Sequence, residues 1–227
     1  MNANNLIKTI KDIFCDSSKE YYQPPQEHFC PMDLNDSDSR NCMILIDASV
    51  SMNKKDWKPS RLIAAIKSVE AFVNRLACEN PDARIAIAAY GDNAQLILDF
   101  TPAANHTDII NSLKNICFLG DTNIGDALRI ASQRLMNASG NNQVILLSDG
   151  WNNTGDSPKY IADKLKMHAT IEVIGIGGTP ACVDEALLKH IASPYPDGTK
   201  RYRWIGDTQG LIQHFHNLAG RLERVKI

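Results

Sequence analysis

The sequence has no apolar stretch long enough to cross a bilayer and no excess of charge of either sign. Its 227 residues hold 24 Lys+Arg and 26 Asp+Glu, which gives a formal net charge of −2. An even balance of this kind predicts binding neither to nucleic acid nor to a membrane. Because residues 1–15 lack the apolar core of a secretory signal, we expect a cytoplasmic protein.

The cysteines give no strong signal. There are six of them, and no two form a C-x-x-C pair or a common zinc spacing, so free thiols in a reducing compartment are expected. A cluster of His28, Cys30, Cys42 and Cys15 could bind zinc, but its spacing is irregular. The acidic run 33–38 resembles a calcium loop, yet it lacks the glycine and glutamate that such a loop needs. A polar linker is the better interpretation.

The composition of the chain changes near Arg40. Residues 1–40 are interpreted as an N-terminal arm or linker, and residues 41–227 as one domain in which apolar strands alternate with amphipathic helices. Strands are expected at 42–46, 84–90, 95–100, 144–147, 171–176 and 202–205. Helices are expected at 62–76, 107–117, 124–136, 158–168 and 183–191, and a last one, capped by Asp207, extends to Leu222. Ser60 is the expected N-cap of the first helix.

Strands separated by helices imply parallel pairing with right-handed crossovers. The turn residues 91–93 favour a hairpin, so strand 95–100 should run antiparallel to strand 84–90. The predicted fold class is α/β: a doubly wound, Rossmann-like, mostly parallel six-stranded sheet with one short antiparallel strand and helices on both faces. In such sheets a ligand binds at the carboxyl ends of the strands, near the switch point.

Three loops bring hard oxygen donors to that end of the sheet. One carries the sequence Asp-Ala-Ser-Val-Ser after the first strand, one carries Ser-Asp-Gly after strand 144–147, and one precedes helix 124–136. The candidate metal ligands are Asp47, Ser49, Ser51, Thr122 and Asp149. Two carboxylates and three hydroxyls suit Mg²⁺ or Mn²⁺, and less well Ca²⁺. Each motif alone is a common turn or cap, and Thr122 could be only an N-cap, but their joint occurrence favours a metal site.

This pattern of D-x-S-x-S, a threonine before a mid-domain helix, and S-D-G resembles the metal-ion-dependent adhesion site of von Willebrand factor type A domains. The resemblance covers roughly residues 41–223 and all five candidate ligands. It implies that Ser49, Ser51 and Thr122 touch the metal and that the two aspartates often act through water. It also implies that a Glu or Asp of a protein partner takes the sixth position. Intracellular members that resemble this chain often act as a subunit or adaptor of a larger complex.

The expected function is a metal-dependent protein-interaction module and not an enzyme, with no catalytic residue and no organic cofactor. One alternative is a metal-dependent hydrolase or phosphotransfer enzyme. The chain nevertheless has no G-x-x-x-x-G-K-[ST] loop, no Asp-x-Asp pair after the first strand, and no histidine beside the site loops. A scaffold with a vestigial metal site is a second alternative.

Trp151 is expected either to be an exposed anchor for a partner or to pack on a neighbouring loop. Asp121 and Asp126 could tune the charge of the site, but a solvated role is expected for both.

Overall fold

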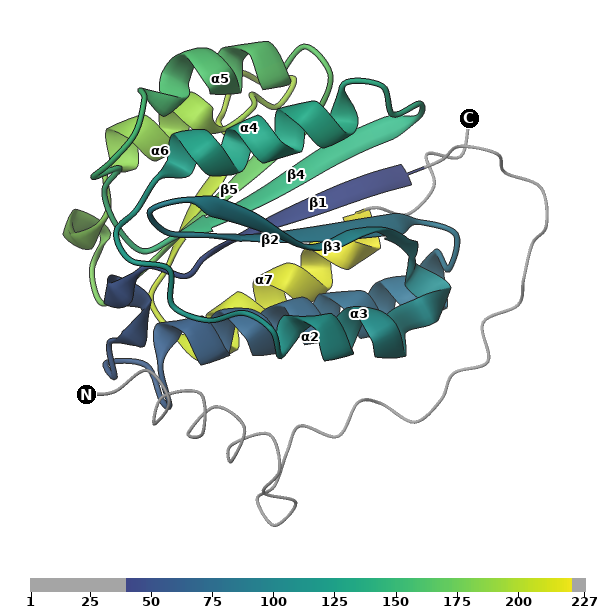
Figure 1. Ribbon diagram of the computed structural model, residues 1–227, viewed down its shortest axis with the longest axis horizontal. Helices are drawn as coiled ribbons and strands as arrows, with labels where there is room; N and C mark the ends of the chain where they lie inside the picture. The colour runs from purple at the N-terminus through teal and green to yellow at the C-terminus, as the bar shows by residue number, and fades with distance from the viewer. Residues whose placement is uncertain (1–39, 222–227) are drawn as a thin grey trace.

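The middle layer of the molecule is a six-stranded sheet with helices on both sides (Figure 1). The computed structural model describes residues 40–221, so nearly all of the predicted arm lies outside the described residues. The strands are β1 (Arg40–Asp47), β2 (Arg84–Tyr90), β3 (Ala94–Pro102), β4 (Asn141–Ser148), β5 (Thr170–Ile176) and β6 (Tyr202–Ile205). Their order is β3-β2-β1-β4-β5-β6; β2 and β3 pair antiparallel, and the other neighbours pair parallel.

Helices cover both faces of this sheet (Figure 1). One face carries α2 (Arg61–Glu79), α3 (His106–Leu113) and α7 (Thr208–Arg221), and the other carries α4 (Ile124–Leu135), α5 (Pro158–Leu165) and α6 (Glu185–Ile191). Short 3-10 turns are η1 (Val50–Asn53), η2 (Ala103–Asn105) and η3 (Pro180–Cys182). No helix within residues 40–221 is long and apolar enough to span a membrane. The predicted doubly wound α/β fold is confirmed.

The position of β1 between the two helical layers explains why its sequence is continuously apolar. Ile44 and Ile46 belong to the core beneath α2 and α7, whereas Met43 and Leu45 belong to the core beneath α4 and α5. Alternate side chains of a strand point to opposite faces, so a strand covered on both sides needs apolar residues at every position. The same strand buries Cys42, and burial raises the pKa of its thiol to about 12.

That position bears on the zinc hypothesis. The other three members of the suggested cluster lie outside the described residues. Cys42 itself packs among apolar side chains of the core on the α2 side, and the residue is 1% exposed. Among residues 40–221, Cys42 belongs to no group of three or more His, Cys, Asp and Glu side chains that could hold a metal. The structure therefore gives no support to zinc binding by Cys42.

Several predicted element boundaries differ from the observed ones. Helix α3 ends at Leu113 instead of residue 117, because the N–H of Lys114 bonds to the carbonyls of Asn111 and Ser112 and closes a tight turn. Helix α6 begins at Glu185 instead of residue 183, because the side chain of Asp184 caps it. Strand β3 is longer than predicted at both ends. Ser60 caps α2 as predicted, since its hydroxyl accepts the N–H of Ile63.

Candidate metal site

The carboxyl ends of β1 and β4 form the edge at which the predicted ligands gather. The two strands are parallel neighbours, and their register places Ile46 opposite Leu147. Asp47 and Ser148, the next residues, therefore end the two strands at the same level. From β1 the chain crosses to β2 on one side, whereas β4 lies on the other side. This is the switch point of the sheet, where doubly wound folds bind their ligands.

Asp47 is buried at the end of β1 and is held by neutral groups. Its Oδ1 accepts the backbone N–H of Ser49 at 2.9 Å, and its Oδ2 accepts the hydroxyl of Ser148 at 3.1 Å. Burial, and after it the charge of Asp149, raises the pKa of Asp47. A buried carboxylate beside a second carboxylate is unstable in its charged form unless a cation compensates it.

The loop after β1 (the first loop) and the loop after β4 (the third loop) meet through a chain of oxygen atoms, and the loop before α4 is the second loop. The Oγ atoms of Ser49 and Ser51 are 2.9 Å apart, and the hydroxyl of Ser51 donates to Asp149 Oδ1 at 2.5 Å. Ser49 and Asp149 are buried, and Ser51 is half-buried. Four of the five predicted ligands are thus connected directly through side-chain and backbone hydrogen bonds.

Thr122, the fifth predicted ligand, lies between these two loops. Its carbonyl accepts the N–H groups of Asn153 and Thr154 at 2.9 and 3.3 Å, which ties it to the third loop. Two residues earlier in the chain, the carbonyl of Gly120 accepts the N–H of Val50 in the first loop at 2.8 Å. Thr122 is buried, and Asn123, not Thr122, caps α4 through a bond from Asp126 N–H. The capping explanation for Thr122 therefore does not apply.

Arg61 belongs to the site although the sequence pattern did not indicate it. Its guanidinium is buried, and Nη1 donates to Asp149 Oδ2 at 2.9 Å. The partners are 88 positions apart in the chain, so no local spacing could have revealed the pair. Ser148 was also missed as a partner of Asp47, although it lies within the S-D-G motif. Asp126, expected to be solvated, instead accepts the N–H of Ala94 and pairs with Arg129.

The donor set fits a hard divalent cation. Carboxylate and hydroxyl oxygens of the loops after β1 and β4 come together, and backbone hydrogen bonds hold the loop of Thr122 against both. Oxygen donors of these kinds are the ligands that Mg²⁺ and Mn²⁺ prefer. Within residues 40–221, no three or more His, Cys, Asp or Glu side chains form a group that could hold a metal. Any cation at this edge would therefore depend on the serine and threonine hydroxyls as well as on the two aspartates.

Two apolar side chains flank the candidate site on the surface. Trp151, one residue beyond Gly150, is 55% exposed, and Val50, between the two serines, is 65% exposed. Of the two alternatives for Trp151, the structure favours the exposed one. Lys54 and Lys55 follow η1 and are exposed as well. Asp121 is exposed, as expected, and its N–H donates to Asp92.

Comparison with known proteins points to one family. A family model described as the von Willebrand factor type A domain matches residues 42–152. Complement C2 of Bos taurus is 28% identical over 210 residues, which cover 78% of this chain and 26% of that protein. The chain matches only 26% to 36% of the length of the first curated relatives.

Solved structures agree on the fold. A von Willebrand factor type A protein from Catenulispora acidiphila superposes with a TM-score of 0.68 at 18% identity, over 80% of this chain and 42% of that one. A mussel byssus protein, proximal thread matrix protein 1, superposes with a TM-score of 0.66 at 22% identity, over 80% of this chain and 45% of that one. Its structure is described as having a zinc-occupied metal-ion-dependent adhesion site. At these identities the likeness concerns the fold.

Proposed function

This chain belongs to the von Willebrand factor type A domain family, and from that premise we propose that it is a metal-dependent protein-interaction module and not an enzyme. The family commonly mediates metal-dependent protein interactions. The observation that carries the proposal is the hydrogen-bonded convergence of Asp47, Ser49, Ser51 and Asp149 at the switch point. Thr122 lies between their loops.

In the proposed metal-bound site, the hydroxyls of Ser49, Ser51 and Thr122 hold Mg²⁺ or Mn²⁺, with Asp47 and Asp149 acting directly or through water. The bound cation supplies Lewis acidity at a position open to a partner. Asp47, Asp149 and Asp56 with Arg61 carry two negative charges, which one divalent cation neutralises while its open coordination position still accepts an oxygen ligand. We propose that a Glu or Asp carboxylate of the partner, a hard oxygen ligand, fills that position.

The surface around the site supports a partner with a particular chemistry. Trp151 and Val50 offer apolar contact next to the proposed metal, and the exposed Lys54 and Lys55 favour acidic residues. The proposed partner segment thus carries Glu or Asp beside an aliphatic or aromatic residue. Membership of a larger assembly, as subunit or adaptor, is part of the same proposal.

Thermal unfolding with and without metal tests the site. Millimolar Mg²⁺ or Mn²⁺ should raise the midpoint of the wild type over that in EDTA, because a ligand bound only by the folded state stabilises it. The free energy of unfolding rises by about 2.7 kcal/mol when the free metal concentration is 100 times Kd. Asp47→Asn should abolish the increase. Asp99→Asn, on the exposed edge of β3 and paired with Arg134, is the matched control and should respond like the wild type. A wild type that ignores both metals would contradict the proposal.

Selection of displayed random peptides tests the partner chemistry. In millimolar Mg²⁺ the wild type should enrich peptides with Asp or Glu beside an apolar residue, and EDTA should release them. Peptides that lack a carboxylate, or that stay bound in EDTA, would argue against a metal-mediated contact. For the enzyme alternative, the same preparations are given p-nitrophenyl phosphate. Turnover by the wild type that disappears in Asp47→Asn would replace the binding function by a hydrolytic one.

A further inference from the structure

Arg61, the first residue of α2, places a permanent positive charge inside the candidate metal site. Its side chain is 2% exposed, and the residue it pairs with, Asp149, is fully buried. An arginine does not lose its proton in a protein, so the charge is present at every relevant pH. A buried cation of this kind needs an explanation, because burying a charge is costly unless it is paired.

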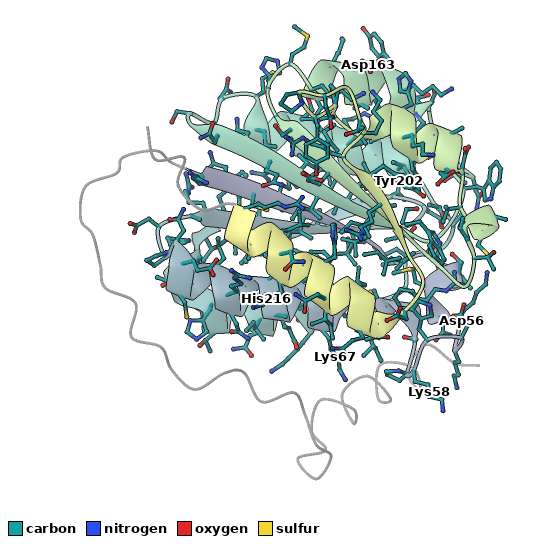
Figure 2. The ribbon with its side chains drawn as sticks, turned by 180° about the vertical axis from the view of Figure 1, so that it is seen from behind. Asp56, Lys58, Lys67, Asp163, Tyr202 and His216 are labelled. Atoms are coloured by element: carbon teal, nitrogen blue, oxygen red, sulfur yellow. The ribbon has the colours of Figure 1, made fainter. Side chains whose placement is uncertain are left out.

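The guanidinium is held from two sides. Nη1 donates to Asp149 Oδ2 at 2.9 Å, while Nε donates to Asp56 Oδ1 at 3.0 Å and Nη2 pairs with the other oxygen of Asp56. Asp56 lies in the connection between η1 and α2, at the same end of the molecule as Lys58 (Figure 2). A Cβ on Gly177, after β5, would lie 3.7 Å from Nη1, so the chain after β5 also lies close to the guanidinium.

The two aspartates of the site are therefore compensated differently. Both oxygens of Asp149 are engaged, Oδ1 by the Ser51 hydroxyl and Oδ2 by the Arg61 cation. Asp47 accepts hydrogen bonds from Ser49 and Ser148, which are neutral. Arg61 thus already supplies to Asp149 the positive charge that a bound metal would otherwise bring.

We propose that Arg61 is a built-in countercharge that stands in for the metal: it stabilises the metal-free site and, by repelling a second cation, lowers the affinity for the metal. The inference rests on the proposed metal site. Removing the charge leaves Asp149 buried without compensation, so the metal-free protein becomes less stable. The incoming divalent cation then meets one more negative charge, so it binds more tightly.

The test measures metal affinity and stability together, by titration calorimetry with Mg²⁺ and Mn²⁺ and by thermal unfolding in EDTA and in metal. Arg61→Gln should lower the midpoint in EDTA, enlarge the metal-induced increase and tighten the metal Kd by about tenfold, the order expected when one nearby unit charge is removed. Arg61→Lys, which keeps the charge, should remain near the wild-type Kd.

A matched control separates this role from simple support of the fold. Arg201→Gln breaks another arginine–carboxylate pair, to the buried Glu172 at 2.8 Å, away from the site loops. It should lower the midpoint equally with and without metal and leave the Kd unchanged. If Arg61→Gln behaves like this control, or if it weakens metal binding, then Arg61 only positions Asp149 and the proposal is overturned.

A second variant tests the proposal without removing the arginine. Asp56→Asn takes away the outer carboxylate, whose side chain is 37% exposed, and leaves the Arg61 charge less compensated. The metal Kd should then weaken, in the direction opposite to Arg61→Gln. Equal shifts of the same sign in the two variants overturn the proposal. If neither the wild type nor any variant binds metal, the proposed function fails as well. If the wild type binds and Arg61→Gln binds no more tightly, only this inference fails.

Discussion

Trp151, one residue beyond the Ser-Asp-Gly motif, exposes its indole to solvent, and its proposed contact with a partner can be tested by substitution. Trp151→Ser should leave both the midpoint and the metal-induced increase unchanged, because the ring is 55% exposed. The substitution should weaken the binding of the peptides selected in Mg²⁺ by about 1–2 kcal/mol, the contribution expected of an aromatic anchor. Tyr160→Ser, on α5 and 65% exposed, is the control. Unchanged peptide affinity in Trp151→Ser would remove the indole from the interface.

A second residue-scale prediction concerns Gly155, which supports the loop that carries Thr122. Its φ is +76°, and a Cβ there would lie 2.4 Å from the Asn123 side chain, the cap of α4. Gly198 has a similar φ of +85°, but a Cβ there would meet nothing within 4 Å. Both alanine variants therefore carry backbone strain of about 1 kcal/mol, and only Gly155→Ala also displaces Asn123.

In urea unfolding, we expect Gly155→Ala to lose at least about 1 kcal/mol more of the free energy of unfolding than Gly198→Ala. It should also reduce the metal-induced rise in the thermal midpoint. The metal response of Gly198→Ala should match the wild type. Equal losses in the two variants would mean that the third loop moves without disturbing Asn123 and that the second loop is less closely coupled to it than the contacts indicate.

At the scale of elements, α7 carries a histidine that is kept neutral. Burial, and after it the charges of Arg203 and Arg221, lower the pKa of His214 to about 4. A histidine in the unfolded chain has a pKa of about 6.5. The unfolded state therefore binds more protons, and this part of the stability is present above about pH 6.5 and is lost as pH falls towards 4.

Urea unfolding at pH 7 and pH 5 measures this loss. His214→Gln should reduce the difference between the two pH values by on the order of 1 kcal/mol, a figure discounted because the side chain is partly exposed. The pKa of His216 is also lowered, by burial and by Arg75, so some pH dependence should remain. His168→Gln, on the exposed surface, is the control. An undiminished pH dependence in His214→Gln would contradict the assignment.

The elements themselves were largely predictable because their apolar spacing reports burial. Strand β1 is covered on both faces and is apolar throughout, and the cap of α2 at Ser60 is a local signal. The end of α3 was missed because the turn after Leu113 continues the apolar pattern without the helix. Boundaries of this kind depend on backbone hydrogen bonds that residue type alone does not fix.

The candidate site was predictable for a different reason, namely that a parallel sheet brings its carboxyl ends together. The predicted fold class alone placed Asp47 and Asp149 at one edge of the sheet, and the structure places both there. The Arg61 pair was beyond the reach of the sequence, because a lysine or arginine in the first turn of a helix is usually solvated. Only the tertiary fold reveals that this one is buried.

At the scale of the whole molecule, the two helical layers enclose separate cores, and the layer of α2 and α7 is joined by an aromatic pair. The rings of Phe72 and Phe215 meet edge to face with centroids 6.0 Å apart, and both side chains are fully buried. Phe215→Ala should therefore lower the free energy of unfolding by about 3–5 kcal/mol and the unfolding midpoint by about 10 °C.

The same variant asks whether this core and the metal site are energetically independent. Phe72 is eleven residues from Arg61, about 16 Å along the axis of α2, and substitutions separated by more than about 7–10 Å usually add. The metal-induced stabilisation measured in Phe215→Ala should therefore equal that of the wild type, although the starting stability is lower. A metal response that shrinks or grows in Phe215→Ala would show that α7 and the switch point are coupled through α2, and then the packing of the last helix would belong to the mechanism by which the site responds to its ligand.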